Sequence, residues 1–120
     1  MYPYGVVGGA SHKKELSAEL ARAGDARHFI SWAGAVAGLR GGALSDLAVA
    51  AEAALTDIFL SSEGGTLEIE SATTGDGVRI TIHHTELQRR RMAGLGRIME
   101  QFLDGHEIFP TNVVLIKRLG

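Results

Sequence analysis

The spacing of apolar residues changes from a helical to a two-residue period at Gly64 and Gly65, and this change restricts the fold most strongly. Residues 66–71 (TLEIES) and 78–83 (VRITIH) alternate apolar and polar side chains, and residues 73–77 (TTGDG) join them. This pattern predicts a β-hairpin with one apolar face. The residues on that face are Leu67, Ile69, Val78, Ile80 and Ile82. Such a face must be covered, so the chain needs helices as well as strands.

Two helices are predicted before the hairpin. Asp25 is predicted to cap the first helix and Ser45 the second, because short polar side chains accept hydrogen bonds from the first N–H groups of a helix. The first helix has one apolar stripe, made of Phe29, Ile30, Ala33, Val36 and Ala37. The second, over residues 46–60 (DLAVAAEAALTDIFL), is apolar on nearly every side and is predicted to be the buried central helix.

Weaker signals complete the order of elements. A short first strand is predicted over residues 14–20, and a third helix starts near Leu95 and stops at Gly105. Two strands follow over residues 106–109 and 112–118. The order βααββαββ predicts an α+β fold. We expect a two-layer α/β sandwich with three helices on one face of a mostly antiparallel sheet.

The composition narrows the classes of function. The 120 residues carry a net charge of −2 and include no cysteine, so disulfides, thiolate catalysis and thiolate metal sites are excluded. The chain has no surplus of basic residues that would indicate a nucleic-acid or membrane partner. A cytoplasmic protein is expected. Residues 1–13 are predicted to be a flexible segment and residues 14–120 one domain. The histidines lack the spacing of metal ligands, since His83 and His84 are strand neighbours that point to opposite faces.

Glu52 is the first candidate for chemistry, because a carboxylate in an apolar helix is costly to bury without partners. Thr56 lies one turn further along the same face, and Asp57 lies off to the side. Two polar groups on one face of a buried helix can hold a water molecule or a magnesium ion. The alternative is that Glu52 points to solvent at the edge of the helix.

The stretch 93–105 (AGLGRIMEQFLDG) is the second candidate, since Gly94 and Gly96 lie where the third helix opens. Glycines let the backbone approach a phosphate closely, and the N–H groups at a helix start favour an anion. The alternative is an ordinary loop. Residues 89–91 (RRR) could clasp an anion or an acidic partner, or form a solvated loop.

The order of several segments is more specific than any one of them. Residues 24–39 (GDARHFISWAGAVAGL) and 45–59 (SDLAVAAEAALTDIF) precede the strand 77–84 (GVRITIHH), and residues 93–118 (AGLGRIMEQFLDGHEIFPTNVVLIKR) follow it. They resemble, in turn, the first helix, the N-box helix, the strand into the G1 box, and the G2 helix with final strands of the GHKL superfamily of histidine-kinase-like ATPases. Within that superfamily the likeness is to the small bacterial anti-sigma factors and switch-protein serine kinases. It extends over residues 14–119.

The resemblance implies a catalytic role for Glu52, as general base toward a water molecule or a partner's serine. The magnesium-binding asparagine of this family lies four residues after that glutamate. Here Thr56 occupies the place, or Asp57 after a shift of one residue. Gly94 and Gly96 would match the loop that wraps the phosphates of ATP.

The remaining nucleotide positions depart further from the family. Thr111 would match the threonine that supports the adenine site. His84 stands where the family has the aspartate that binds the adenine amino group, and a histidine does not replace a carboxylate acceptor simply. The segment 85–92, in the place of the nucleotide lid, is short. The implied cofactor is ATP with Mg²⁺ if this altered site binds nucleotide, and no other metal is expected.

These observations predict a regulatory protein that binds a protein partner, such as a switch protein, a sigma factor or another regulator. The first alternative is an active ATP-binding serine-protein kinase or ATPase that uses Glu52 as general base. The second is a structural dimerisation module built on the first helix, and a homodimer fits all three hypotheses.

Overall fold

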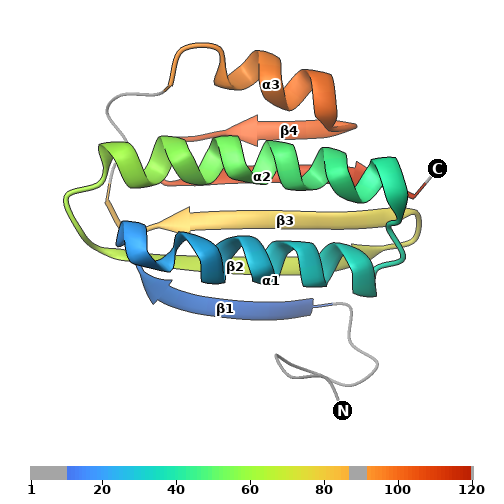
Figure 1. Ribbon diagram of the computed structural model, residues 1–120, viewed down its shortest axis with the longest axis horizontal. Coiled ribbons are helices and arrows are strands. Elements are labelled where there is room, and N and C mark those ends of the chain that lie inside the picture. Colours follow the sequence, from blue (N-terminus) through green and yellow to red (C-terminus); the bar gives the residue numbers. More distant parts are fainter. Residues whose placement is uncertain (1–10, 87–91, 120) are drawn as a thin grey trace.

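The computed structural model of the protein describes residues 11–86 and 92–119. Three α-helices, one short 3-10 helix and five strands follow one another in this part of the chain (Figure 1). Their bounds are β1 Ser11–Ser17, η1 Leu20–Arg22, α1 Ala23–Val36, α2 Gly41–Ser61, β2 Thr66–Thr74, β3 Gly77–His84, α3 Leu95–Phe102, β4 Gly105–Ile108 and β5 Asn112–Arg118. The predicted order of helices and strands is therefore confirmed.

The strands form one sheet in the order β1-β2-β3-β5-β4, and every neighbouring pair is antiparallel. The predicted hairpin is confirmed as β2 and β3, with Ile69 opposite Ile82. Both strands run closer to the turn than predicted. Gly77 is required there because a Cβ atom would lie 2.1 Å from the carbonyl oxygen of Lys117 on β5.

Helices α1 and α2 run antiparallel to each other over one face of the sheet, and α3 packs against α2 and β4 (Figure 1). The alternation of the strands places their apolar side chains beneath this helical layer. The largest fully buried side chains come from both layers: Phe29, Ile30, Leu39, Leu47, Leu55, Ile58, Leu67, Ile69, Ile80, Ile82, Leu95 and Met99. The fold is α+β, as predicted.

Both predicted helix caps are wrong. Helix α1 begins at Ala23, so Asp25 lies in its first turn, where its carboxylate accepts a hydrogen bond from Arg22 at 3.3 Å. Helix α2 begins at Gly41, so Ser45 lies inside the helix. Neither helix has a side-chain cap at its first residue. The 3-10 helix η1 leads directly into α1, and Ala43 and Leu44 near the start of α2 pack against the core, so each helix extends further back than the polar side chains indicated.

Strand β1 starts and ends three residues earlier than predicted, at Ser11 and Ser17. The last three residues of the predicted flexible segment 1–13 therefore belong to the sheet, and residues 1–10 lie outside the described part of the chain. Among the described residues, no helix combines the length and the apolar character needed to cross a membrane.

Helix α2 is buried along one side only, which corrects the prediction of a helix buried all round. Its inward side includes Leu47, Leu55 and Ile58, each at most 2% exposed. On the other side Val49 is 44% exposed and Leu60 is 77% exposed. The outer side of α2 thus exposes apolar side chains to solvent.

Candidate functional site

The residues predicted to bind nucleotide fall on two sides of helix α2. Asp57 faces inward, and its carboxylate connects to the segment before Gly94. Glu52 and Thr56 face outward and line one shallow cavity between α1 and α2. Glu52, the predicted base, and Asp57, one of the two candidates for the magnesium position, therefore point in different directions.

Asp57 is only 3% exposed and joins α2 to the start of α3. Its Oδ1 atom accepts a hydrogen bond from the backbone N–H of Met92, and its backbone carbonyl accepts one from the hydroxyl of Ser61. Met92 in turn accepts a hydrogen bond from the N–H of Leu95, the first residue of α3. The carboxylate thus holds the chain immediately before the helix, where negative charge is favourable.

His84 is 1% exposed and connects three segments. Its Nδ1 atom lies 3.0 Å from the carbonyl oxygen of Glu86, and its Nε2 atom lies 3.2 Å from that of Gly64. Its backbone N–H donates to the carbonyl oxygen of Thr111 at 2.8 Å. The structure therefore brings the predicted residues His84 and Thr111 together, through the backbone of the strand ends.

Ser62 lies beside this histidine, with its Oγ atom 3.3 Å from the Nε2 atom of His84. The same hydroxyl lies 2.6 Å from the carbonyl oxygen of Gly64 and also accepts a hydrogen bond from the N–H of Gly64. The short distance assigns the hydroxyl proton to the carbonyl oxygen rather than to the imidazole. This pair closes the loop between α2 and β2 instead of forming an activated nucleophile.

The two glycines of the predicted phosphate loop have different roles in the fold. Gly94 precedes α3 with a φ of +83°, a left-handed conformation that strains other residues. Gly96 lies inside α3, and a Cβ atom there would meet nothing within 4 Å. The fold needs glycine at position 94 but not at position 96. The predicted lid, residues 85–92, and the basic run 89–91 fall largely or wholly outside the described residues.

Glu52 forms an ion pair with Arg27 of α1, with the Nη1 atom 3.1 and 3.2 Å from the two carboxylate oxygens. Both side chains are half exposed. Of the two alternatives for Glu52, a buried carboxylate or one at the solvent-exposed edge of the helix, the structure shows the exposed edge. The pair spans the groove between α1 and α2.

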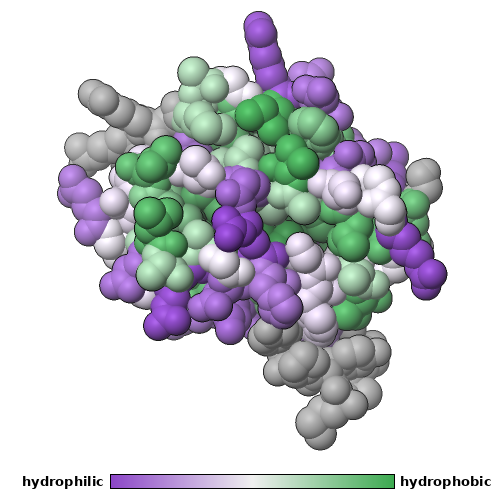
Figure 2. All heavy atoms as spheres, viewed as in Figure 1, coloured by the Kyte–Doolittle hydropathy of each residue, from purple (hydrophilic) through white to green (hydrophobic). Residues whose placement is uncertain are grey.

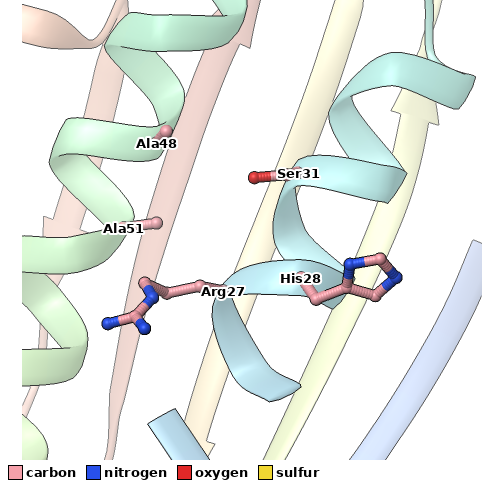
Figure 3. A pocket seen from close by; sticks show the side chains of 5 residues that line it. All are labelled: Arg27, His28, Ser31, Ala48 and Ala51. Carbon is pink, nitrogen blue, oxygen red and sulfur yellow. The ribbon is translucent and has the colours of Figure 1, made fainter. Parts of the chain in front are cut away.

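Two cavities lie along that groove and share Arg27. The smaller, of about 90 Å³, is lined by Leu20, Ala23, Arg27, Glu52, Leu55, Thr56, Phe59 and Leu60. The larger, of about 280 Å³, is lined by Arg27, His28, Ser31, Ala48 and Ala51. Figure 3 shows Arg27 and Ser31 reaching toward α2, and Ala48 and Ala51 facing them. The small side chains leave the groove open, which suits contact with another surface better than enclosure of a small ligand.

Three features of this region did not emerge from the sequence. Arg27 is the partner of Glu52, although 25 residues separate them. Ser62 contacts His84 across 22 residues. The exposure of Leu60 follows from its position two helical turns after Glu52, on the same face. That spacing was the one signal in the sequence that could have revealed it.

Within residues 11–86 and 92–119, no group of three histidine, aspartate or glutamate side chains could hold a metal ion. No protein-family model and no curated protein matches the chain.

Proposed function

We propose that the protein is a cytoplasmic regulator that acts by binding another protein, with the nucleotide site of its GHKL-like fold closed by its own side chains. The partner would be a sigma factor, a switch protein or another regulator of the same class. The order of helices and strands supports the resemblance from which this proposal starts. The single observation that carries the proposal is the position of Asp57.

The carboxylate of Asp57 is buried and accepts a hydrogen bond from Met92, in the segment directly before the glycines that the resemblance assigns to phosphate binding. A phosphate brought to that segment would meet a negative charge of the protein itself. Two like charges in a poorly solvated place repel each other strongly. This arrangement therefore supports a site that no longer accepts ATP.

The surroundings of His84 support the same conclusion. The resemblance puts this ring in the place of the adenine-binding aspartate, and the ring contacts carbonyl oxygens on two sides of the strand end. These contacts fix the loop between α2 and β2 against β3. A base that entered here would have to break them before making any of its own.

A calorimetric titration of the purified protein with Mg-ATP and Mg-ADP tests the closed site. We expect no heat of binding and no rise in the unfolding temperature. A ligand present at 100 times its dissociation constant would add about 2.7 kcal/mol to the folded state, so binding would be visible by both methods. Saturable binding of either nucleotide would overturn the closed site and favour the kinase or ATPase hypothesis.

The partner-binding half of the proposal needs a separate measurement. The protein should form a stable complex with a purified sigma factor or switch protein from its own organism, and complex formation should not depend on nucleotide. Failure to bind any such partner, together with binding of ATP, would remove the proposal as a whole.

A further inference from the structure

The outer edge of strand β1 presents backbone groups that the described part of the chain does not use. Figure 1 shows β1 at one margin of the sheet, with no described element beyond it. The register between β1 and β2 runs without a break from Ser11 to Ser17, so the strand has no bulge, and it contains no proline. Short length, bulges, prolines and charged side chains normally protect an exposed edge from pairing with another chain. Of these features, β1 has only the charged side chains.

The opposite margin of the sheet is better protected. Strand β4 has four residues, Gly105–Ile108, and Pro110 follows it closely. A strand this short offers few backbone groups to another chain. Of the two margins, that of β1 therefore has the length and the regularity that pairing with a further strand requires.

The hydrogen bonds between β1 and β2 show which backbone groups of β1 face outward. The N–H of Ala18 donates to the carbonyl oxygen of Gly65 at 2.9 Å, in the same register as the two strands. Bonded and non-bonded positions alternate along an antiparallel pair. Every second residue before Ala18 therefore bonds to β2, and the N–H and C=O groups of Lys13, Glu15 and Ser17 point away from it. Within residues 11–86 and 92–119, no hydrogen bond reaches these outward groups.

The side chains beside this edge carry an unbalanced charge. Glu15 is exposed and lies directly opposite Glu68 of β2, on the face of the sheet away from the helices. Like charges in directly opposed positions destabilise a sheet. The ammonium group of Lys13 lies 3.9 Å from Glu68 and 3.5 Å from Glu70, so it is shared between two carboxylates other than that of Glu15. A basic side chain placed opposite Glu15 from outside the sheet would reduce this imbalance.

We propose that the outer edge of β1 binds an extended segment of a partner protein as an additional antiparallel strand, with a basic side chain opposite Glu15. The outward backbone groups of Lys13, Glu15 and Ser17 bond to the backbone of that segment. Polar side chains gather along this margin, at the bottom of the view, so backbone hydrogen bonds rather than apolar contacts hold the segment (Figure 2). The inference rests on the partner-binding half of the proposed function and adds where the partner binds and which charge it brings.

A second copy of β1 does not fit this edge. Two copies related by a two-fold axis would pair antiparallel about one central residue. In the registers that overlap most of the strand, this residue is Lys13, Lys14 or Glu15. Each register sets a charged side chain directly against its own equivalent, which is unfavourable in a sheet. The charges of β1 thus protect the edge against its own kind and leave it open to a segment of different charge.

Hydrogen exchange measured by nuclear magnetic resonance tests the proposal, with a short peptide of alternating threonine and valine that carries a central lysine. At saturating peptide, exchange of the N–H groups of Lys13, Glu15 and Ser17 should slow by about tenfold. Exchange at Lys14, whose N–H already bonds to β2, should change little. The same peptide with a central glutamate should bind about fivefold more weakly. In Glu15→Lys the preference between the two peptides should reverse.

Two controls separate strand addition from other modes of binding. A peptide N-methylated at the lysine and the nearest threonines, whose N–H groups would face β1, should not bind. A peptide N-methylated at the valines, whose N–H groups would face away, should bind like the parent peptide. On the side of the protein, Glu15→Pro removes one outward N–H group and no bond to β2. This variant should keep its fold by circular dichroism and lose the peptide.

The contrary results are equally specific. The proposal is wrong if neither peptide binds at millimolar concentration, or if exchange slows at Lys14 as much as at Lys13. Protection of the outward groups at high protein concentration without peptide would assign the edge to a second copy. A sigma factor or switch protein that binds Glu15→Pro as tightly as the wild type would overturn the edge and keep the proposed function. Peptide binding without binding of any such partner would support the edge and remove the proposed class of partner.

Discussion

Helix α2 carries one carboxylate on its inner side and one on its outer side, and the two differ in exposure and in the groups they contact. Asp57 is 3% exposed and bonds to the backbone of Met92, whereas Glu52 is half exposed and pairs with Arg27. Five residues separate them, which is about 140° around a helix. The inner carboxylate stabilises the fold, and the outer one is free to take part in contacts with other molecules.

This difference shows how a buried polar group and an exposed one respond to change. When one partner of a buried hydrogen bond is removed, the other is left without a hydrogen bond and out of reach of water, which costs about 1–3 kcal/mol. Loss of an exposed ion pair costs far less, because water replaces the partner. Substitutions of buried polar residues should therefore lower the free energy of unfolding far more than substitutions of exposed ones.

His84→Ala should have the largest effect, a loss of about 3 kcal/mol in the free energy of unfolding. The substitution removes a ring that is 1% exposed and leaves a cavity together with the carbonyl oxygens of Gly64 and Glu86. Urea denaturation measures the change. The matched control is His83→Ala on the solvent side of the same strand, which should change stability little. Equal losses in both variants would contradict the buried role of His84.

Asp57→Ala should cost about 2 kcal/mol, because the N–H of Met92 loses its buried acceptor. Asp57→Asn keeps an oxygen acceptor in the same place and should retain most of the stability. Urea denaturation of both variants separates the hydrogen bond from the charge. If Asp57→Asn is as unstable as Asp57→Ala, the negative charge itself stabilises the start of α3, and the role of the hydrogen bond is smaller than stated.

The sheet and the order of elements could be predicted from the sequence because their signals are local. Alternation in residues 66–71 and 78–83 identifies a hairpin within a few residues of its true bounds. The helix starts could not be predicted. Asp25 and Ser45 resemble caps, but η1 leads directly into α1, and the packing of Ala43 and Leu44 against the core extends α2 past Ser45. A capping preference of about 1 kcal/mol yields to such packing.

The candidate site was less accessible to prediction than the fold. An alanine-rich helix such as α2 gives no clear apolar stripe, so the sequence did not show that Glu52 faces outward. The pairing of Glu52 with Arg27 depends on how α1 and α2 lie side by side, which only the complete fold determines. The contact between Asp57 and Met92 likewise joins residues that are 35 positions apart.

The glycines of the predicted phosphate loop provide a smaller test. Gly94→Ala should destabilise the protein by about 1 kcal/mol, because an alanine is strained at a φ of +83°. Gly96→Ala should stabilise it by about 0.5 kcal/mol, because alanine favours the helix and its Cβ atom meets no neighbour. Thermal unfolding of the two variants should shift in opposite directions. A destabilised Gly96→Ala would show that this glycine has a structural role that the described contacts do not include.

Glu52→Gln should have the smallest effect, a change of a few tenths of a kcal/mol in the stability of the monomer. The carboxylate loses its charge but keeps its size, and both it and Arg27 are half exposed. Urea denaturation measures the change. A loss as large as that of Asp57→Ala would show that the outer ion pair is a structural element of the fold. Since Asp57 and Glu52 lie on one helix, that result would remove the distinction between its two sides. A small loss in the free energy of unfolding would mean that the fold does not depend on the charge of Glu52. This carboxylate is then available for contacts with another molecule.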